Sequence, residues 1–140
     1  MKAMKSTSII MLIAISLFAC NAPSSQDQSN ASVGEGDLQV YYFHFTKRCA
    51  TCNAVENETN MVLEMFYTDQ VKEGNIAFTS LNLEEEDGKE MAKQLNVSGQ
   101  TLLLVKDEEM VNLTNEGFMN ARTKPDKFHE ILRTQIDKLL

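Results

Sequence analysis

The chain has 140 residues, and its 20 acidic side chains outnumber its 13 lysines and arginines, which gives a formal net charge of -7 at pH 7. An acidic balance of this size argues against nucleic-acid binding, so no nucleic-acid partner is expected. The length suits one domain with a single core rather than several domains.

Residues 1–19 have the pattern of a signal peptide. Two lysines near the start give a positive segment, and the apolar run over 9–18 is too short to span a membrane comfortably. We therefore expect these residues to be removed rather than to join the fold. An ordinary secreted protein, cut near Ala19 or Ala22, fits the same pattern.

The segment Leu17-Phe18-Ala19-Cys20 resembles the lipobox of bacterial lipoproteins. This resemblance implies cleavage before Cys20 and lipidation of its sulfur, which would anchor the protein to a membrane of the bacterial cell envelope. Lipidation would also account for the third cysteine, because the chain has only three and Cys49 and Cys52 would then form the remaining pair.

The segment 20–37 is predicted to be a flexible tether that follows the lipidated cysteine. It consists mainly of Ser, Asn, Gln, Gly and Ala with few charges, a composition that cannot form a core. The folded domain is therefore expected over 38–140.

A dithiol motif follows the first predicted strand. The run over 40–46 is rich in aromatic and β-branched residues and predicts a strand buried on both faces. Cys49-Ala50-Thr51-Cys52 comes next and opens a stretch that predicts a helix. Unpaired N–H groups and the macrodipole at a helix N-terminus favour a thiolate, and thiolates are the species that attack disulfides.

Three hypotheses fit this motif: a redox-active dithiol, a metal site and an inert structural disulfide. The strand-to-helix context favours the redox dithiol. A closed tetrahedral zinc site needs four ligands, and only His44 and His129 remain as further nitrogen ligands. Nothing in the sequence places either histidine near the thiols, so no metal is expected.

Three residues near the motif are candidates for tuning the pKa of the Cys49 thiol. The positive charges of Lys47 and Arg48 would lower that pKa if they point at the sulfur, but both residues also fit a solvated loop. Because histidine side chains in general titrate near neutral pH, His44 could act as a proton shuttle, or it could be a packed strand residue.

The helix that begins at Ala50 is predicted to extend to about residue 72. Gly74 lies where a glycine commonly ends a helix. The residues that lie close to one face of this helix, and are expected to face the core, are Val55, Val62, Met65 and Phe66.

Periodicity predicts the later elements as well. A strand is expected over 76–83, a short helix over 87–95, and a hairpin of strands over 101–105 and 110–113. Thr123-Lys124-Pro125-Asp126 resembles a capping box with proline in the first turn, and it predicts a last helix running to residue 140. The inward stripe of that helix is predicted as Phe128, Ile131, Leu132, Gln135 and Leu139.

The predicted order is β-α-β-α-β-β-α. The first two strands are expected to pair in parallel through a right-handed crossover connection. With the Cys-x-x-Cys motif at the start of the first helix, this order resembles the thioredoxin fold. The resemblance covers nearly all of residues 38–140. It implies an α/β domain whose central four-stranded mixed sheet is flanked by helices.

A narrower resemblance is to small thioredoxin-like bacterial lipoproteins named after a nitrophenyl-compound nitroreductase subunit. The segments that carry this resemblance are 41–44, 48–52, 97–105 and 113–122. No flavin or metal motif accompanies them, so an accessory electron-carrying role is the most that this family name implies. A non-catalytic accessory or metal-binding subunit of an envelope reductase complex is the alternative function.

Two positions depart from the thioredoxin pattern. Gln100 stands where thioredoxins usually carry a cis-proline, and a cis bond at a non-proline residue is costly, so a trans peptide is expected. Phe43 stands where many thioredoxins carry a buried acid.

The thioredoxin resemblance implies a thiol-disulfide exchange protein that needs no cofactor beyond its own cysteines. Cys49 is expected to be the nucleophile, and Cys52, one turn further along the helix, the resolving thiol. Gly99, Gln100 and Thr101 should form the substrate-facing loop beside the pair. The expected partners are proteins with thiols or disulfides in the cell envelope.

Overall fold

The structure is a computed structural model, and it describes residues 37–140. The predicted signal peptide, the lipidation of Cys20 and the tether up to residue 36 lie outside the described residues. The described strands are β1 (Leu38–His44), β2 (Ile76–Asn82), β3 (Thr101–Lys106) and β4 (Glu109–Asn112). The described helices are α1 (Ala50–Phe66), α2 (Thr68–Lys72), α3 (Glu86–Gln94), α4 (Thr114–Asn120) and α5 (Pro125–Leu139). None of these helices is both long enough and apolar enough to cross a membrane.

The strands form one mixed sheet in the order β2-β1-β3-β4. Strand β1 pairs parallel to β2 and antiparallel to β3. Strands β3 and β4 form an antiparallel hairpin, whose turn includes Asp107 at a positive φ of 53°. The predicted α/β class, the four-stranded mixed sheet, the parallel first pair and the hairpin are therefore confirmed.

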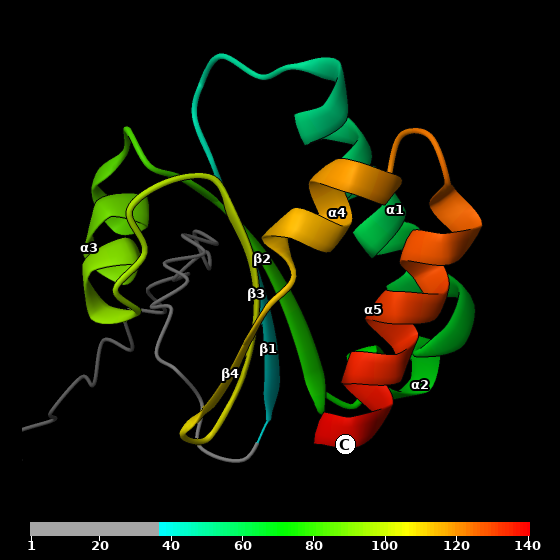
Figure 1. Cartoon of the computed structure of the whole chain (residues 1–140). Helices are drawn as coiled ribbons and strands as arrows, with labels where there is room; N and C mark the ends of the chain where they lie inside the picture. The colour runs from blue at the N-terminus through cyan, green and yellow to red at the C-terminus, as the bar shows by residue number, and fades with distance from the viewer. Residues whose placement is uncertain (1–36) are drawn as a thin grey trace, which may run out of the picture.

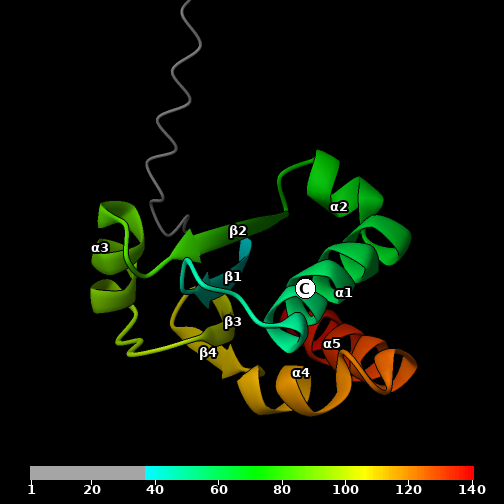
Figure 2. The same cartoon turned by 90° about the horizontal axis from the view of Figure 1, so that it is seen from above.

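Helices cover both faces of the sheet, as Figures 1 and 2 show. Helix α3 lies on one face, and α1, α2, α4 and α5 lie on the other. Because side chains alternate along a strand, β1 contributes to both cores: Tyr41 and Phe43 join the cluster on the α3 side, whereas Val40 and Tyr42 join the larger cluster. The prediction that this strand is buried on both faces is confirmed.

The predicted helix over 50–72 is interrupted at Tyr67. The backbone there leaves the helical region, with φ -129° and ψ 25°, and the side chain is buried. Its hydroxyl donates a hydrogen bond to the Oδ1 atom of Asp137 in α5 at 2.5 Å. This contact spans 70 residues, so local periodicity could not reveal that the helix ends before Tyr67.

Two of the residues predicted to face inward from α1 do not. Met65 is 62% exposed and Phe66 is 42% exposed, whereas Val55 and Val62 are fully buried as predicted. Helix α1 also buries Cys52, Thr59 and Leu63. Phe66 instead packs outside the core, where the guanidinium carbon of Arg133 lies 3.9 Å from its ring centroid.

The C-terminal part contains a helix that the sequence did not predict. Helix α4 follows the hairpin directly, so the order has two more helices, α2 and α4, than expected. The predicted capping box is wrong, because Lys124 is the N-cap residue of α5 and no side chain caps the helix. The hydroxyl of Thr123 donates to the carbonyl oxygen of Met119 instead.

The predicted inward stripe of α5 is mostly confirmed. Phe128, Leu132 and Leu139 are buried, whereas Ile131 and Gln135 are only partly covered. Ile136, which the predicted stripe omitted, is fully buried.

Candidate functional site

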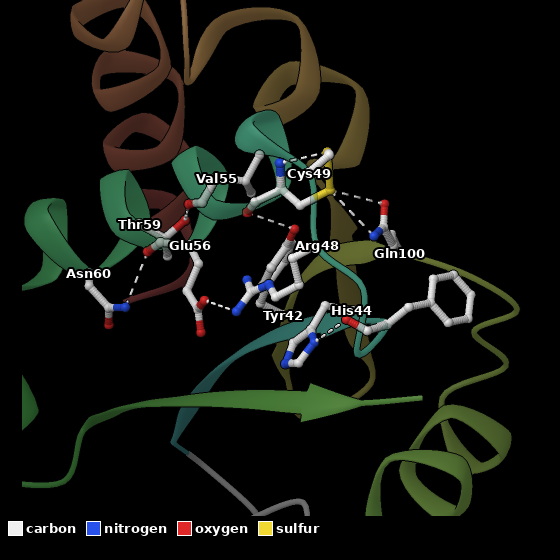
Figure 3. A network of polar contacts seen from close by, with 11 residues as sticks. Tyr42, His44, Arg48, Cys49, Val55, Glu56, Thr59, Asn60 and Gln100 are labelled. Carbon is white, nitrogen blue, oxygen red and sulfur yellow. Dashed lines mark hydrogen bonds and ion pairs between the residues drawn. A yellow bond between two sulfur atoms is a disulfide. The ribbon is translucent and has the colours of Figure 1, made fainter. Parts of the chain in front are cut away.

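Cys49 and Cys52 form a disulfide at the start of α1, with their Cα atoms 5.1 Å apart. Strand β1 ends at His44, and a short loop leads from it to Cys49, which lies immediately before the first residue of the helix. The site is therefore at the C-terminal end of a central strand, where Figure 3 shows it from close by.

The two sulfur-bearing residues differ in accessibility. Cys49 is exposed, whereas Cys52 lies one turn into the helix and is only 2% exposed. A partner protein can therefore approach Cys49 but not Cys52.

The N-terminus of α1 provides a favourable environment for a thiolate at Cys49. Cys49 is the N-cap residue, in an extended backbone conformation, and the backbone N–H of Cys52 donates to its sulfur at 3.2 Å. The first turn of α1 contains no acidic residue that would oppose a negative charge. Once the disulfide is reduced, this N–H and the helix dipole favour the ionised form of Cys49.

Arg48 connects the loop before the disulfide to α1. Its Nη1 atom lies 2.5 Å from the Oε2 atom of Glu56, and its guanidinium carbon lies 5.5 Å from the ring centroid of Tyr42. Its Nε and Nη2 atoms are buried without a hydrogen-bond partner in the described part of the chain. Glu56 thus compensates the charge of Arg48, and Lys47 is exposed; that either residue tunes the pKa of Cys49 stays a prediction.

Tyr42 is a site residue that the sequence did not single out. It is fully buried, and its hydroxyl donates a 2.9 Å hydrogen bond to the backbone carbonyl oxygen of Cys52. Burial raises the pKa of Tyr42, and the neighbouring Arg48 opposes this shift. The available signal was its place in β1, because a buried tyrosine hydroxyl usually finds a partner.

The predicted substrate-facing loop contacts the disulfide through one side chain. The amide group of Gln100 lies against the sulfur of Cys52, with Nε2 at 3.4 Å and Oε1 at 3.6 Å. The hydroxyl of Thr101 donates to the carbonyl oxygen of Gly99 at 3.0 Å, which closes the loop on itself. All peptide bonds of residues 37–140 are trans, so the expected trans peptide at Gln100 is confirmed.

Neither described histidine is hydrogen-bonded to a sulfur. The Nδ1 atom of His44 lies 3.0 Å from the carbonyl oxygen of Phe45. The Nε2 atom of His129 in α5 lies 2.6 Å from the Oε2 atom of Glu58 in α1. Over residues 37–140, no group of three or more His, Cys, Asp or Glu side chains is arranged to hold a metal ion.

Comparison with models of known protein families found no match for the chain. Comparison with curated proteins found none either.

Three solved structures show what the fold is similar to. Thioredoxin from Fasciola hepatica aligns with 76% of this chain and 84% of its own, at 15% identity and a TM-score of 0.48. A thioredoxin from Thermus thermophilus aligns with 72% of this chain and 75% of its own, at 18% identity and a TM-score of 0.40. A malarial protein covers 53% of this chain and 74% of its own, at 21% identity and a TM-score of 0.39. Similarities this low identify no family and no activity, so the function has to be argued from the geometry of the disulfide.

Proposed function

We propose that this chain is a thiol-disulfide exchange protein in which Cys49 is the nucleophile and Cys52 the resolving thiol. The observation that carries the proposal is the asymmetry of the disulfide. One sulfur is exposed at a helix N-terminus that favours a thiolate, and the other is buried one turn along the same helix. This arrangement suits attack by the first sulfur and resolution by the second.

The exchange reaction proceeds in two balanced steps. The thiolate of Cys49 attacks one sulfur of a partner disulfide, and the partner's other sulfur leaves as a thiolate and takes up a proton. The sulfur of Cys52 then loses its proton and attacks the sulfur of Cys49. This closes the internal disulfide and releases the partner's remaining thiol. The partner gains two electrons, and the reverse sequence oxidises a partner dithiol.

The cellular setting is also part of the proposal. Residues 1–19 would direct export, and lipidated Cys20 with the segment up to residue 37 would tether the domain to a membrane of the bacterial cell envelope. The partners would then be envelope proteins that contain thiols or disulfides. The composition of the N-terminal segment and its lipobox-like ending support this setting. The resemblance to the nitroreductase-named lipoproteins agrees with an electron-carrying role in the same compartment.

A trapping experiment tests the exchange reaction. The reduced Cys52→Ser variant should form a stable covalent adduct with a disulfide-containing protein, because the resolving sulfur is missing. A reducing agent should cleave this adduct, because it is a mixed disulfide. The Cys49→Ser variant is the matched control and should form no adduct. If Cys52→Ser protein forms no adduct with a model disulfide protein or with envelope proteins, the proposed function is wrong.

A fractionation experiment tests the setting. Full-length protein expressed in bacteria should sediment with membranes and carry a lipid on residue 20, detectable by mass spectrometry of the N-terminal peptide. The Cys20→Ala variant should leave the membrane fraction. Unchanged sedimentation of that variant would contradict lipid anchoring while leaving the exchange chemistry untouched.

A further inference from the structure

The side chain of Gln100 lies beside the sulfur of Cys52. Gln100 places both ends of its amide within 3.6 Å of that sulfur. A disulfide sulfur carries no hydrogen, so in the oxidised protein only the contact from Nε2, at 3.4 Å, can be a hydrogen bond.

Burial makes this contact important for the chemistry. Cys52 is only 2% exposed, and a buried thiol in apolar surroundings resists ionisation. The resolving step nevertheless requires Cys52 to attack as a thiolate. Some group therefore has to stabilise negative charge on this sulfur while the bond to Cys49 forms.

We propose that Gln100 is a catalytic residue of the resolving step, in which its side-chain N–H donates to the attacking sulfur of Cys52. This inference rests on the proposed exchange reaction and assigns one step of it to a particular side chain.

The carboxamide of Gln100 can hydrogen-bond to the sulfur of Cys52 in both its thiol and its thiolate form without moving. When Cys52 is a thiol, its S–H can donate to Oε1; when it is a thiolate, it accepts from Nε2. As Cys52 attacks the sulfur of Cys49, the new internal S–S bond forms and the bond from Cys49 to the partner breaks. The electron pair leaves with the partner sulfur, which takes up a proton while Cys52 gives one up.

The backbone holds Gln100 in place for this role. It precedes Thr101, the first residue of β3, whose backbone is paired with Phe43 of β1. The hydrogen bond from Thr101 to Gly99 fixes the residues on either side of it. The amide is therefore presented from the sheet rather than from a long loop.

Single-turnover kinetics with a chromogenic disulfide tests the proposal. Reduced protein mixed with excess bis(carboxynitrophenyl) disulfide should release one coloured thiolate when Cys49 attacks and a second when Cys52 resolves the mixed disulfide. The Gln100→Met variant keeps the size of the side chain but loses the amide. We expect it to slow the second phase about tenfold, because hydrogen bonds to charged groups are among the strong ones. The first phase should stay within about twofold of the unchanged protein's rate, because the Gln100 amide contacts the sulfur of Cys52, which takes no part in the first attack.

Two further variants make the result decisive. Gln94→Met carries the same change at an exposed position at the end of α3 and should leave both phases unchanged. Gln100→Lys restores a donor without an acceptor and should recover most of the second-phase rate. If Gln100→Met leaves the second phase unchanged, slows both phases equally, or is no slower than Gln100→Lys, the role of Gln100 is wrong. If the unchanged protein releases only one thiolate, the proposed function itself is wrong.

Discussion

Tyr42 joins the central strand to the first turn of the helix that carries the disulfide. Its hydroxyl is buried and donates to the carbonyl oxygen of Cys52 at 2.9 Å. Tyr41, the next residue toward the N-terminus, points to the opposite face and packs against Phe43 with ring centroids 6.1 Å apart. Within residues 37–140, the Tyr41 hydroxyl makes no comparable hydrogen bond. The pair thus offers a matched comparison within one strand.

We predict that Tyr42→Phe lowers the free energy of unfolding by about 1–2 kcal/mol, because it removes one buried hydrogen bond without changing the ring. Tyr41→Phe should change it by less than about 0.5 kcal/mol. Urea denaturation of the oxidised protein measures both values. Equal losses in the two variants would show that the bond to Cys52 contributes nothing particular.

Arg48 makes two contacts that lead to another prediction at the residue scale. Its side chain is directed to Glu56 and the ring of Tyr42, so we expect it to stabilise the loop rather than to ionise Cys49. Arg48→Met should lower the free energy of unfolding by about 1–2 kcal/mol, through loss of the ion pair and of the contact with the ring. The rate at which iodoacetamide alkylates reduced Cys49 should change by less than about twofold.

Arg122→Met is the control for this prediction. Because Arg122 is exposed, this substitution should lower the free energy of unfolding by less than about 0.5 kcal/mol. A large drop in the alkylation rate of the Arg48 variant, with stability unchanged, would show instead that the guanidinium acts on the sulfur.

At the scale of elements, local sequence patterns sufficed for the parts of the fold whose signals are local. The periodicity over 76–83, 101–105 and 110–113 predicted β2 and the two strands of the hairpin. Helix α4 was missed because its seven residues include two asparagines and a glycine, which are poor helix formers. It forms where Gly117 comes close to Val55 and Phe128, a tertiary contact without a local signal.

The candidate site shows the same division. The Cys-x-x-Cys pair and the helix that begins beside it could be predicted, because the motif and the periodicity lie in one short segment. The contacts of Tyr42 with Cys52 and of Arg48 with Glu56 could not, since they depend on how the loop between strand and helix folds back. The contact of Gln100 with Cys52 joins residues 48 apart and needs the sheet order, so its loop was expected beside the pair only from the thioredoxin resemblance.

Helix α3 approaches the end of β2 closely enough to require glycine. A Cβ atom added at Gly88 would lie 2.0 Å from the carbonyl oxygen of Asn82, which belongs to the backbone and cannot rotate away. We predict that Gly88→Ala lowers the free energy of unfolding by about 3 kcal/mol, because α3 must shift off the sheet. Thermal and urea denaturation measure the loss.

Gly117→Ala is the comparison for that prediction. Its added Cβ would lie 3.2 Å from a methyl group of Val55, which can move, and alanine is the better helix former by about 1 kcal/mol. The loss should therefore be much smaller. A Gly88→Ala variant as stable as the unchanged protein would contradict the close packing of α3.

Considered as a whole, the domain keeps every tyrosine away from water. The chain has three, Tyr41, Tyr42 and Tyr67, and burial raises the pKa of each above its ordinary value. For Tyr67 the hydrogen bond to Asp137 raises the pKa further. The folded protein therefore holds these protons at pH values where the unfolded chain has lost them.

We predict that the free energy of unfolding falls as the pH rises above about 10, the ordinary pKa of tyrosine, and is unaffected by these groups below it. Ultraviolet absorbance of tyrosinate should appear together with loss of structure in circular dichroism. Tyrosinate that forms near pH 10 in a protein that stays folded would contradict the burial of these hydroxyls.

If the proposed exchange reaction is correct, the burial of Cys52 also limits the order of its steps. Of the two cysteines, only Cys49 is exposed to solvent. An electron donor and an electron acceptor must therefore both react with the Cys49 sulfur, and they cannot be bound to it at the same time. Each has to depart before the other arrives. Steady-state rates measured at several concentrations of both should therefore give parallel double-reciprocal lines, the pattern of ping-pong kinetics.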